Sequence, residues 1–172
     1  MAVTENKLPT HLQKKIIGGF FIMSKVESAD LILKLYDLRR EATMREARNW
    51  MFTFNPQSAE DVEKTMMDPQ VGAYLRMVLS YWDMAGALVN HGAIDADLFN
   101  ETVGEHIGVY TKLEPFIAEL REKWQMPEAF KNLEKVILDR PDGAERVAKT
   151  REWMKSINEQ IAAAQASEAA AA

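Results

Sequence analysis

The sequence predicts an all-α protein, a helical bundle of five or six helices around a central antiparallel helix hairpin. From Met23 onward the apolar residues recur at spacings of three and four, which is typical of helices packed on a core. No sustained period-two alternation and no hairpin dipeptide between β-branched runs interrupts this pattern. Proline, glycine and capping residues divide the chain into segments of helical length.

The composition favours one globular domain and excludes several kinds of site. The chain has 172 residues, a formal net charge of −5 and no cysteine. Domains cluster at about 100–200 residues, so we expect a single domain. Without thiolates the chain can hold neither an iron–sulfur cluster nor a cysteine zinc site. The acidic balance also lowers the expectation of general nucleic-acid binding.

Residues 1–22 stand apart from the helical pattern, and we interpret them as a translated leader or a disordered arm. The apolar run at 16–23 is shorter than the roughly 20 residues of a membrane helix. No small-residue cleavage site follows it, as a signal peptide would require. Gly18 and Gly19 can be encoded as GGAGGN, a ribosome-binding sequence, three codons before a second candidate start at Met23. The alternative is an arm whose aromatic residues pack on the core.

The first half of the domain should contain a long helix, a short helix and a central helix. Ser24 and Glu27 fit a capping box that opens a helix over 24–55. A short helix follows over 58–68, and the third is expected over 69–91. This third helix is apolar over most of its circumference, as is usual for a central helix.

The second half begins with the other arm of the predicted hairpin. Gly92 suits the left-handed position that ends a helix, and Asp95 caps a fourth helix over 95–124 that Pro115 should kink. A fifth helix follows Pro127, and a sixth ends the domain, which we place at 23–161. The alanine-rich tail over 162–172 offers little to bury and should fray.

Few residues are candidates for catalysis. His106 falls on the apolar stripe of the fourth helix beside Glu105, and a buried histidine is usually a satisfied core residue. The alternative is a ligand-binding or metal-dependent bundle enzyme centred on His106, with Glu105, Asp83 and Arg76 as further candidates. Because the Glu-x-x-His pair of di-iron bundles is absent, we assign no metal and no cofactor. Asp83, Arg76 and Ser80 share one strip, which we interpret as a buried polar network.

Two other groups of residues favour association. Gly86, Gly104 and Gly108 lie inside predicted helices, where each glycine costs about 1 kcal/mol relative to alanine. Close helix contacts within the bundle or across a dimer would offset this cost.

The first predicted helix contains an anchor patch of arginine and aromatic residues, which are enriched at interfaces: Arg45, Arg48, Trp50 and Phe54. Acidic residues interspersed on the same helix favour a salt-bridged face. A regulatory nucleic-acid-binding module using this helix remains a second alternative.

The segments LILKLYDLRREATMREARNW and YLRMVLSYWDMAGALVNHGAIDADLF, with the proline-flanked LEPFIAELREKW and FKNLEKVI, resemble a family of small bacterial helical proteins of unknown function. The resemblance spans about residues 29–138 and implies a bacterial, cytoplasmic, all-helical protein without an assigned activity. We therefore expect a non-enzymatic protein–protein interaction or scaffold protein that self-associates. A membrane is not expected as a partner, and nucleic acid is an improbable one.

Overall fold

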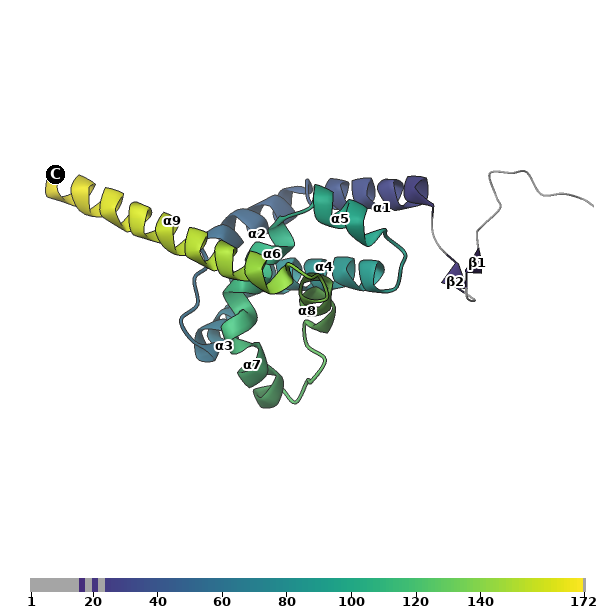
Figure 1. Ribbon diagram of the computed structural model, residues 1–172. Helices are drawn as coiled ribbons and strands as arrows, with labels where there is room; N and C mark the ends of the chain where they lie inside the picture. The colour runs from purple at the N-terminus through teal and green to yellow at the C-terminus, as the bar shows by residue number, and fades with distance from the viewer. Residues whose placement is uncertain (1–15, 18–19, 22–23, 172) are drawn as a thin grey trace, which may run out of the picture.

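The computed structural model describes residues 16–17, 20–21 and 24–171, and it is helical almost throughout (Figure 1). The prediction of an all-α fold is confirmed. Before the helices, β1 (Ile16–Ile17) and β2 (Phe20–Phe21) form a two-residue antiparallel ladder that pairs Ile16 with Phe21. Most of the segment 1–22, which we interpret as a leader or arm, lies outside the described residues.

The long first helix is divided in two. α1 (Lys25–Leu38) begins at the predicted capping box, in which Ser24 accepts from the Glu27 amide at 3.2 Å. α2 (Ala42–Thr53) begins anew after a three-residue break, because the Glu41 carboxylate accepts from a backbone amide in its first turn. The prediction of one helix over 24–55 is therefore wrong at this point. No proline or glycine marks the break.

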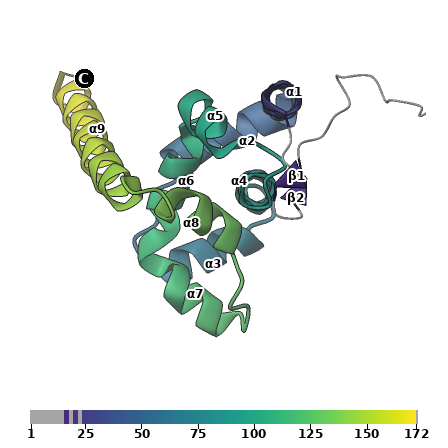
Figure 2. The same ribbon diagram turned by 45° about the vertical axis from the view of Figure 1, so that its right-hand side comes forward.

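α4 lies in the middle of the domain (Figure 2). It follows α3 (Ala59–Met67), which is capped by Ser58 as predicted, and it spans Gly72–Asn90. α4 packs against α2, α3, α5 and α8, and its buried residues occur on several sides of the helix. At its end Gly92 has the left-handed φ of 73° that the sequence predicts.

The predicted fourth helix is divided into shorter elements. α5 (Ala96–Thr102) is capped by Asp95 as expected, and α6 (Glu105–Leu113) follows after an extended Val103. The 3-10 turn η2 (Glu114–Phe116) contains Pro115 and leads into α7 (Ile117–Lys123). The described chain thus contains more and shorter helices than a bundle of five or six, because a β-branched residue before glycine and a proline each end a helix.

The last two elements are α8 (Lys131–Leu138) and α9 (Gly143–Ala171). The first part of α9 packs on α6 and α8, and its C-terminal part extends away from the domain in both views (Figures 1 and 2). The segment predicted to fray remains helical as far as Ala171. No helix within the described ranges has the length and apolar character needed to cross a bilayer.

One continuous core joins these helices. Its largest fully buried side chains are Trp82 of α4, Phe99 of α5 and Tyr110 of α6, each about 1% exposed. Burying an aromatic side chain of this size contributes about 1.5–3 kcal/mol, so these three residues are major sources of stability. Two of them, Trp82 and Phe99, pack against the ring of His106, which is buried as well.

Candidate functional site

A cluster of two arginines and one glutamate joins α1, α2 and α6. Arg39 ends α1 and donates from Nη2 to Oε2 of Glu105 at 2.7 Å. Arg48 of α2 donates from Nε to Oε1 of the same carboxylate at 2.8 Å and also through Nη2. The side chains of Arg39, Arg48 and Glu105 are 15%, 25% and 27% exposed, so the cluster is largely shielded from water. Two guanidinium groups share one carboxylate, which leaves a formal charge of +1.

The cluster shifts the acidity of its members. Burial alone would raise the pKa of Glu105, but the hydrogen bonds and charges of Arg48 and Arg39 outweigh it, so the pKa lies below its ordinary value. The hydrogen bond from Arg48 to Glu105 in turn raises the pKa of Arg48. Glu105 and Arg48 therefore stay charged at neutral pH.

A cavity of about 170 Å³ opens beside Arg39. Its walls come from α1, α4 and α5 and are mainly apolar and aromatic. The guanidinium carbon of Arg39 lies 5.2 Å from the centre of the Trp82 ring and 5.7 Å from that of Tyr36. Arg39 therefore adds one charged group to an otherwise apolar cavity.

His106 lies behind this cavity and is sealed from solvent. It is 1% exposed, and its ring centre lies 5.2 Å from Phe99 and 5.8 Å from Trp82. Neither ring nitrogen has a hydrogen-bond partner among the described residues. His106 is therefore a buried core residue, as expected, but its hydrogen-bonding groups are not satisfied as expected. Burial, with the charges of Arg146 and Arg140, lowers its pKa to about 3. A neutral, sealed imidazole opposes the hypothesis of an enzyme centred on it.

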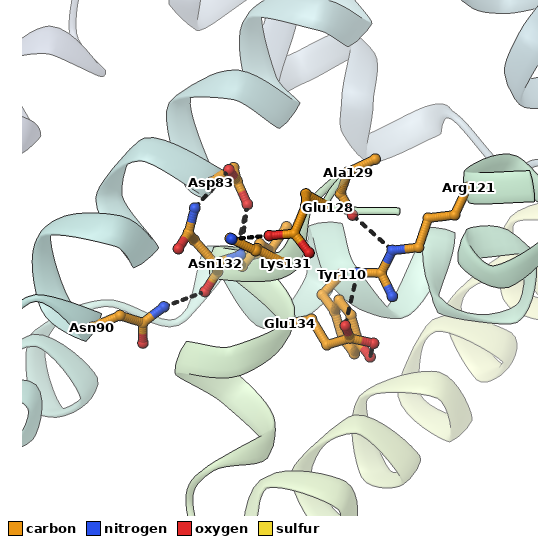
Figure 3. A network of polar contacts seen from close by, with 10 residues as sticks. Asp83, Asn90, Tyr110, Arg121, Glu128, Ala129, Lys131, Asn132 and Glu134 are labelled. Carbon is orange, nitrogen blue, oxygen red and sulfur yellow. Dashed lines mark hydrogen bonds and ion pairs between the residues drawn. The ribbon is translucent and has the colours of Figure 1, made fainter. Parts of the chain in front are cut away.

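Asp83 has a structural role at the start of α8 (Figure 3). Its Oδ1 accepts from the amides of Asn132 and Leu133, both at 3.0 Å, and Oδ2 accepts from the Asn132 side chain. Asn90, two turns further along α4, donates to the Asn132 carbonyl at 3.0 Å. Asp83 thus caps α8. Phe130, the N-cap residue of α8, provides no side-chain cap of its own.

The polar network predicted along α4 does not form. Arg76 donates to the Met66 carbonyl of α3, and the exposed Ser80 donates to the Met77 carbonyl of its own helix. Asp83 points to α8, so Arg76, Ser80 and Asp83 each bind a different partner. Among the residues that the structure describes, no three histidine, aspartate or glutamate side chains are grouped to hold a metal ion.

The four residues of the predicted anchor patch do not form one surface. Arg45 is exposed, whereas Arg48 turns toward Glu105. Trp50 stacks on Phe54 with ring centres 5.0 Å apart, on another side of α2. Acidic residues also pair with neighbouring basic groups of α1, as the salt-bridged interpretation expects: Lys34 with Asp30 and Arg40 with Asp37.

The three glycines differ in how closely they are packed. A Cβ on Gly86 would lie 2.6 Å from the Asn132 carbonyl oxygen, so Gly86 allows α4 and α8 to approach closely. A Cβ on Gly108 would lie 3.1 Å from Cε of Met154 in α9. Gly104 is the N-cap of α6, and a Cβ added to it would meet nothing within 4 Å, so no close contact within the described part of the chain offsets its cost. The alternative, a contact across a dimer, stays a prediction.

Lys112 is a feature that sequence reasoning missed. Its Nζ donates to the Phe52 carbonyl at 3.0 Å and to the Phe54 carbonyl, at the C-terminal end of α2. Burial between α2 and α9 lowers its pKa to about 8. Lysine within an amphipathic helix gives no sequence signal for such a contact, because the carbonyl groups are some 60 residues away.

These features define an all-helical domain with a largely shielded ionic cluster and an apolar cavity. The chain belongs to a family described as a domain of unknown function, DUF4760, which matches residues 24–139. The match covers α1 to α8, and α9 begins after it. No curated protein and no solved structure matches the chain.

Proposed function

We propose that this protein is a non-enzymatic interaction protein that self-associates through α9, with a second copy of the chain as its partner. The proposal is supported by an apolar stripe on α9, which we call the seam and which contains Val147, Met154, Ile157 and Ile161. The seam continues beyond the part of α9 that packs on the domain. The resemblance to bacterial helical proteins supports a bacterial and cytoplasmic setting, which we include in the proposal.

The seam consists of residues spaced by three and four along α9. Val147 is 5% exposed against the core, and Met154 and Ile157 are half-buried. Ile161 lies on the same face one turn further and is 46% exposed, because the domain ends before it. A stripe of this kind buries its apolar surface when a second helix packs along it.

Two exposed aromatic residues widen the apolar surface. Trp153 of α9 is 51% exposed and Phe52 of α2 is 59% exposed. Both line one shallow crevice together with Ile157. Large apolar side chains gathered in this way are typical of interaction sites, and tryptophan is enriched among residues that dominate binding energy.

Charge favours an antiparallel arrangement of two α9 helices. Residues 145–155 contain four basic and two acidic residues, a net charge of +2. Residues 156–171 contain two acidic and no basic residues, a net charge of −2. Antiparallel pairing places each half opposite the complementary half of the partner, whereas parallel pairing places like charges together.

Sedimentation of the full chain at about 10–200 μM tests the proposal, a range suited to weak association. We expect a concentration-dependent monomer–dimer equilibrium that Ile161→Glu abolishes. Ala163→Glu introduces the same charge on the opposite face of the helix and should leave the equilibrium unchanged. A wild-type chain that stays monomeric throughout, or equal effects of both variants, would refute it.

The orientation can be measured with single spin labels, because the native chain has no cysteine. In an antiparallel pair centred on Ile161, labels at Ala164→Cys, on the same face as Ile157 and Ile161, lie about 9 Å apart along the axis. Labels at Lys149→Cys are then about 36 Å apart along the axis, at 1.5 Å per residue. Short distances at both positions would indicate a parallel pair and contradict the antiparallel arrangement.

A further inference from the structure

The cavity beside Arg39, between α1, α4 and α5, has no role in the proposed self-association. Its volume is about 170 Å³, close to the roughly 150 Å³ of an apolar protein cavity that accommodates benzene. Leu35, Trp82, Phe99 and Val103 provide apolar walls. A cavity of this size and lining fits one six-membered ring with a small substituent.

The charge of the surrounding cluster indicates what that substituent is. Arg39 lines the cavity, and Glu105, its ionic partner within the described part of the chain, is shared with Arg48. The cluster therefore has an excess charge of +1 at the edge of an apolar space, where electrostatic interactions are stronger than in water. A monoanion would neutralise this charge.

The hydrogen-bonding capacity left in the walls points the same way. Nε of Arg39 and Nε1 of Trp82 are buried and have no acceptor among the described residues. Each has less than 1 Å² of accessible surface, so a ligand reaches these donors only when a wall side chain moves, and the atom it then presents to them is an acceptor. A buried donor without an acceptor destabilises the unliganded state, so a ligand that satisfies it favours the bound state.

We infer that this cavity binds a small aromatic monocarboxylate of about the size of benzoate, with the ring between Trp82, Phe99 and Val103 and the carboxylate at Arg39. The site is separate from α9, so ligand binding and self-association can each occur without the other. The residues lining the cavity in the described part of the chain include no histidine, carboxylate or lysine, so we assign such a ligand a structural or regulatory role.

Titration calorimetry with the full chain and sodium benzoate tests the inference. We expect a dissociation constant of about 0.1–1 mM, in the range of a nine-atom ligand with good contacts. Benzyl alcohol keeps the ring without the charge, and acetate keeps the charge without the ring. Both should bind at least about tenfold weaker, a difference of about 1.4 kcal/mol.

Two variants and one control locate the site. Arg39→Gln should weaken benzoate binding at least about tenfold, whereas the same change at the exposed Arg40, which does not line the cavity, should leave it within about twofold. Val103→Phe fills the cavity and should abolish binding in a protein that circular dichroism shows to be folded.

Three results would overturn the inference. One is the absence of benzoate binding up to about 10 mM, far above the expected dissociation constant. Another is benzyl alcohol binding as tightly as benzoate. The third is unchanged benzoate affinity in folded Val103→Phe protein.

Discussion

Glu105, the first residue of α6, binds Arg48 of α2 through both of its carboxylate oxygens, across 57 residues of sequence. Arg39 shares the same carboxylate from the end of α1. Because α1 and α2 are separated by a break in the chain, this one side chain fixes both helices relative to α6. Glu105 is therefore a structural centre of the domain and the counter-charge of Arg39, which lines the cavity.

Replacing Glu105 by Gln should destabilise the domain by about 2 kcal/mol in urea unfolding at pH 7, since it leaves two shielded guanidinium groups without a counter-charge. The matched control is Glu60→Gln, which removes an exposed pair with Lys64 and should leave the free energy of unfolding nearly unchanged. Equal effects of the two variants would show that the Glu105 cluster contributes no more than a surface pair.

His106 should make the domain less stable in mild acid. Its folded pKa of about 3 lies below the ordinary value of 6.5, so from pH 6.5 downward the unfolded chain binds a proton that the folded chain does not. Stability is therefore lost as the pH falls, by up to about 2 kcal/mol between pH 7 and pH 5.

The His106→Leu variant tests this dependence, because leucine has a similar volume and does not titrate. Urea unfolding at pH 7 and pH 5 should show a smaller loss of stability for the variant than for the wild type. A parallel fall in stability for the His106 variant would contradict the low pKa.

Lys112 should titrate apart from the surface lysines. Burial lowers its pKa to about 8, whereas the pairing of the exposed Lys149 with Glu145 raises the pKa of Lys149 above its ordinary value. Carbon-13 reductive methylation followed by NMR between pH 7 and pH 11 measures both groups. We expect a midpoint near 8 for the resonance that disappears in Lys112→Arg. A midpoint above 10 for that resonance would contradict the structure.

Gly86 should tolerate no side chain. Gly86→Ala places a Cβ against the backbone of Asn132, and such overpacking costs about 1–3 kcal/mol. Gly104→Ala meets open space at the start of α6 and should change stability by less than about 0.5 kcal/mol. Thermal unfolding of the two variants compares them directly, and a neutral Gly86→Ala would show that α4 and α8 can separate without cost.

Local signals in the sequence identified the ends of several helices correctly. Ser24, Ser58 and Asp95 cap helices because their side chains accept from amides only three residues away. Gly92 ends α4 for an equally local reason, since its φ is positive.

The features that sequence reasoning missed depend on distant contacts. The break before Glu41 has no helix-breaking residue, and Arg39 beside it binds Glu105 across 66 residues. Glu105, Arg48 and His106 were each recognisable as candidates, but their spacing in the sequence does not reveal which of them meet. Lys112 was missed because its partners are main-chain carbonyl groups, which every residue has.

The cap that Asp83 provides has a consequence for the order in which the domain folds. α8 has eight residues, fewer than the roughly 12–15 at which isolated helices become stable, and its first amides depend on an acceptor some 50 residues earlier in the chain. α8 therefore cannot nucleate by itself and forms only after α4 has done so. In hydrogen exchange, the amide of Leu133 reports the docking of the two helices rather than the local stability of α8.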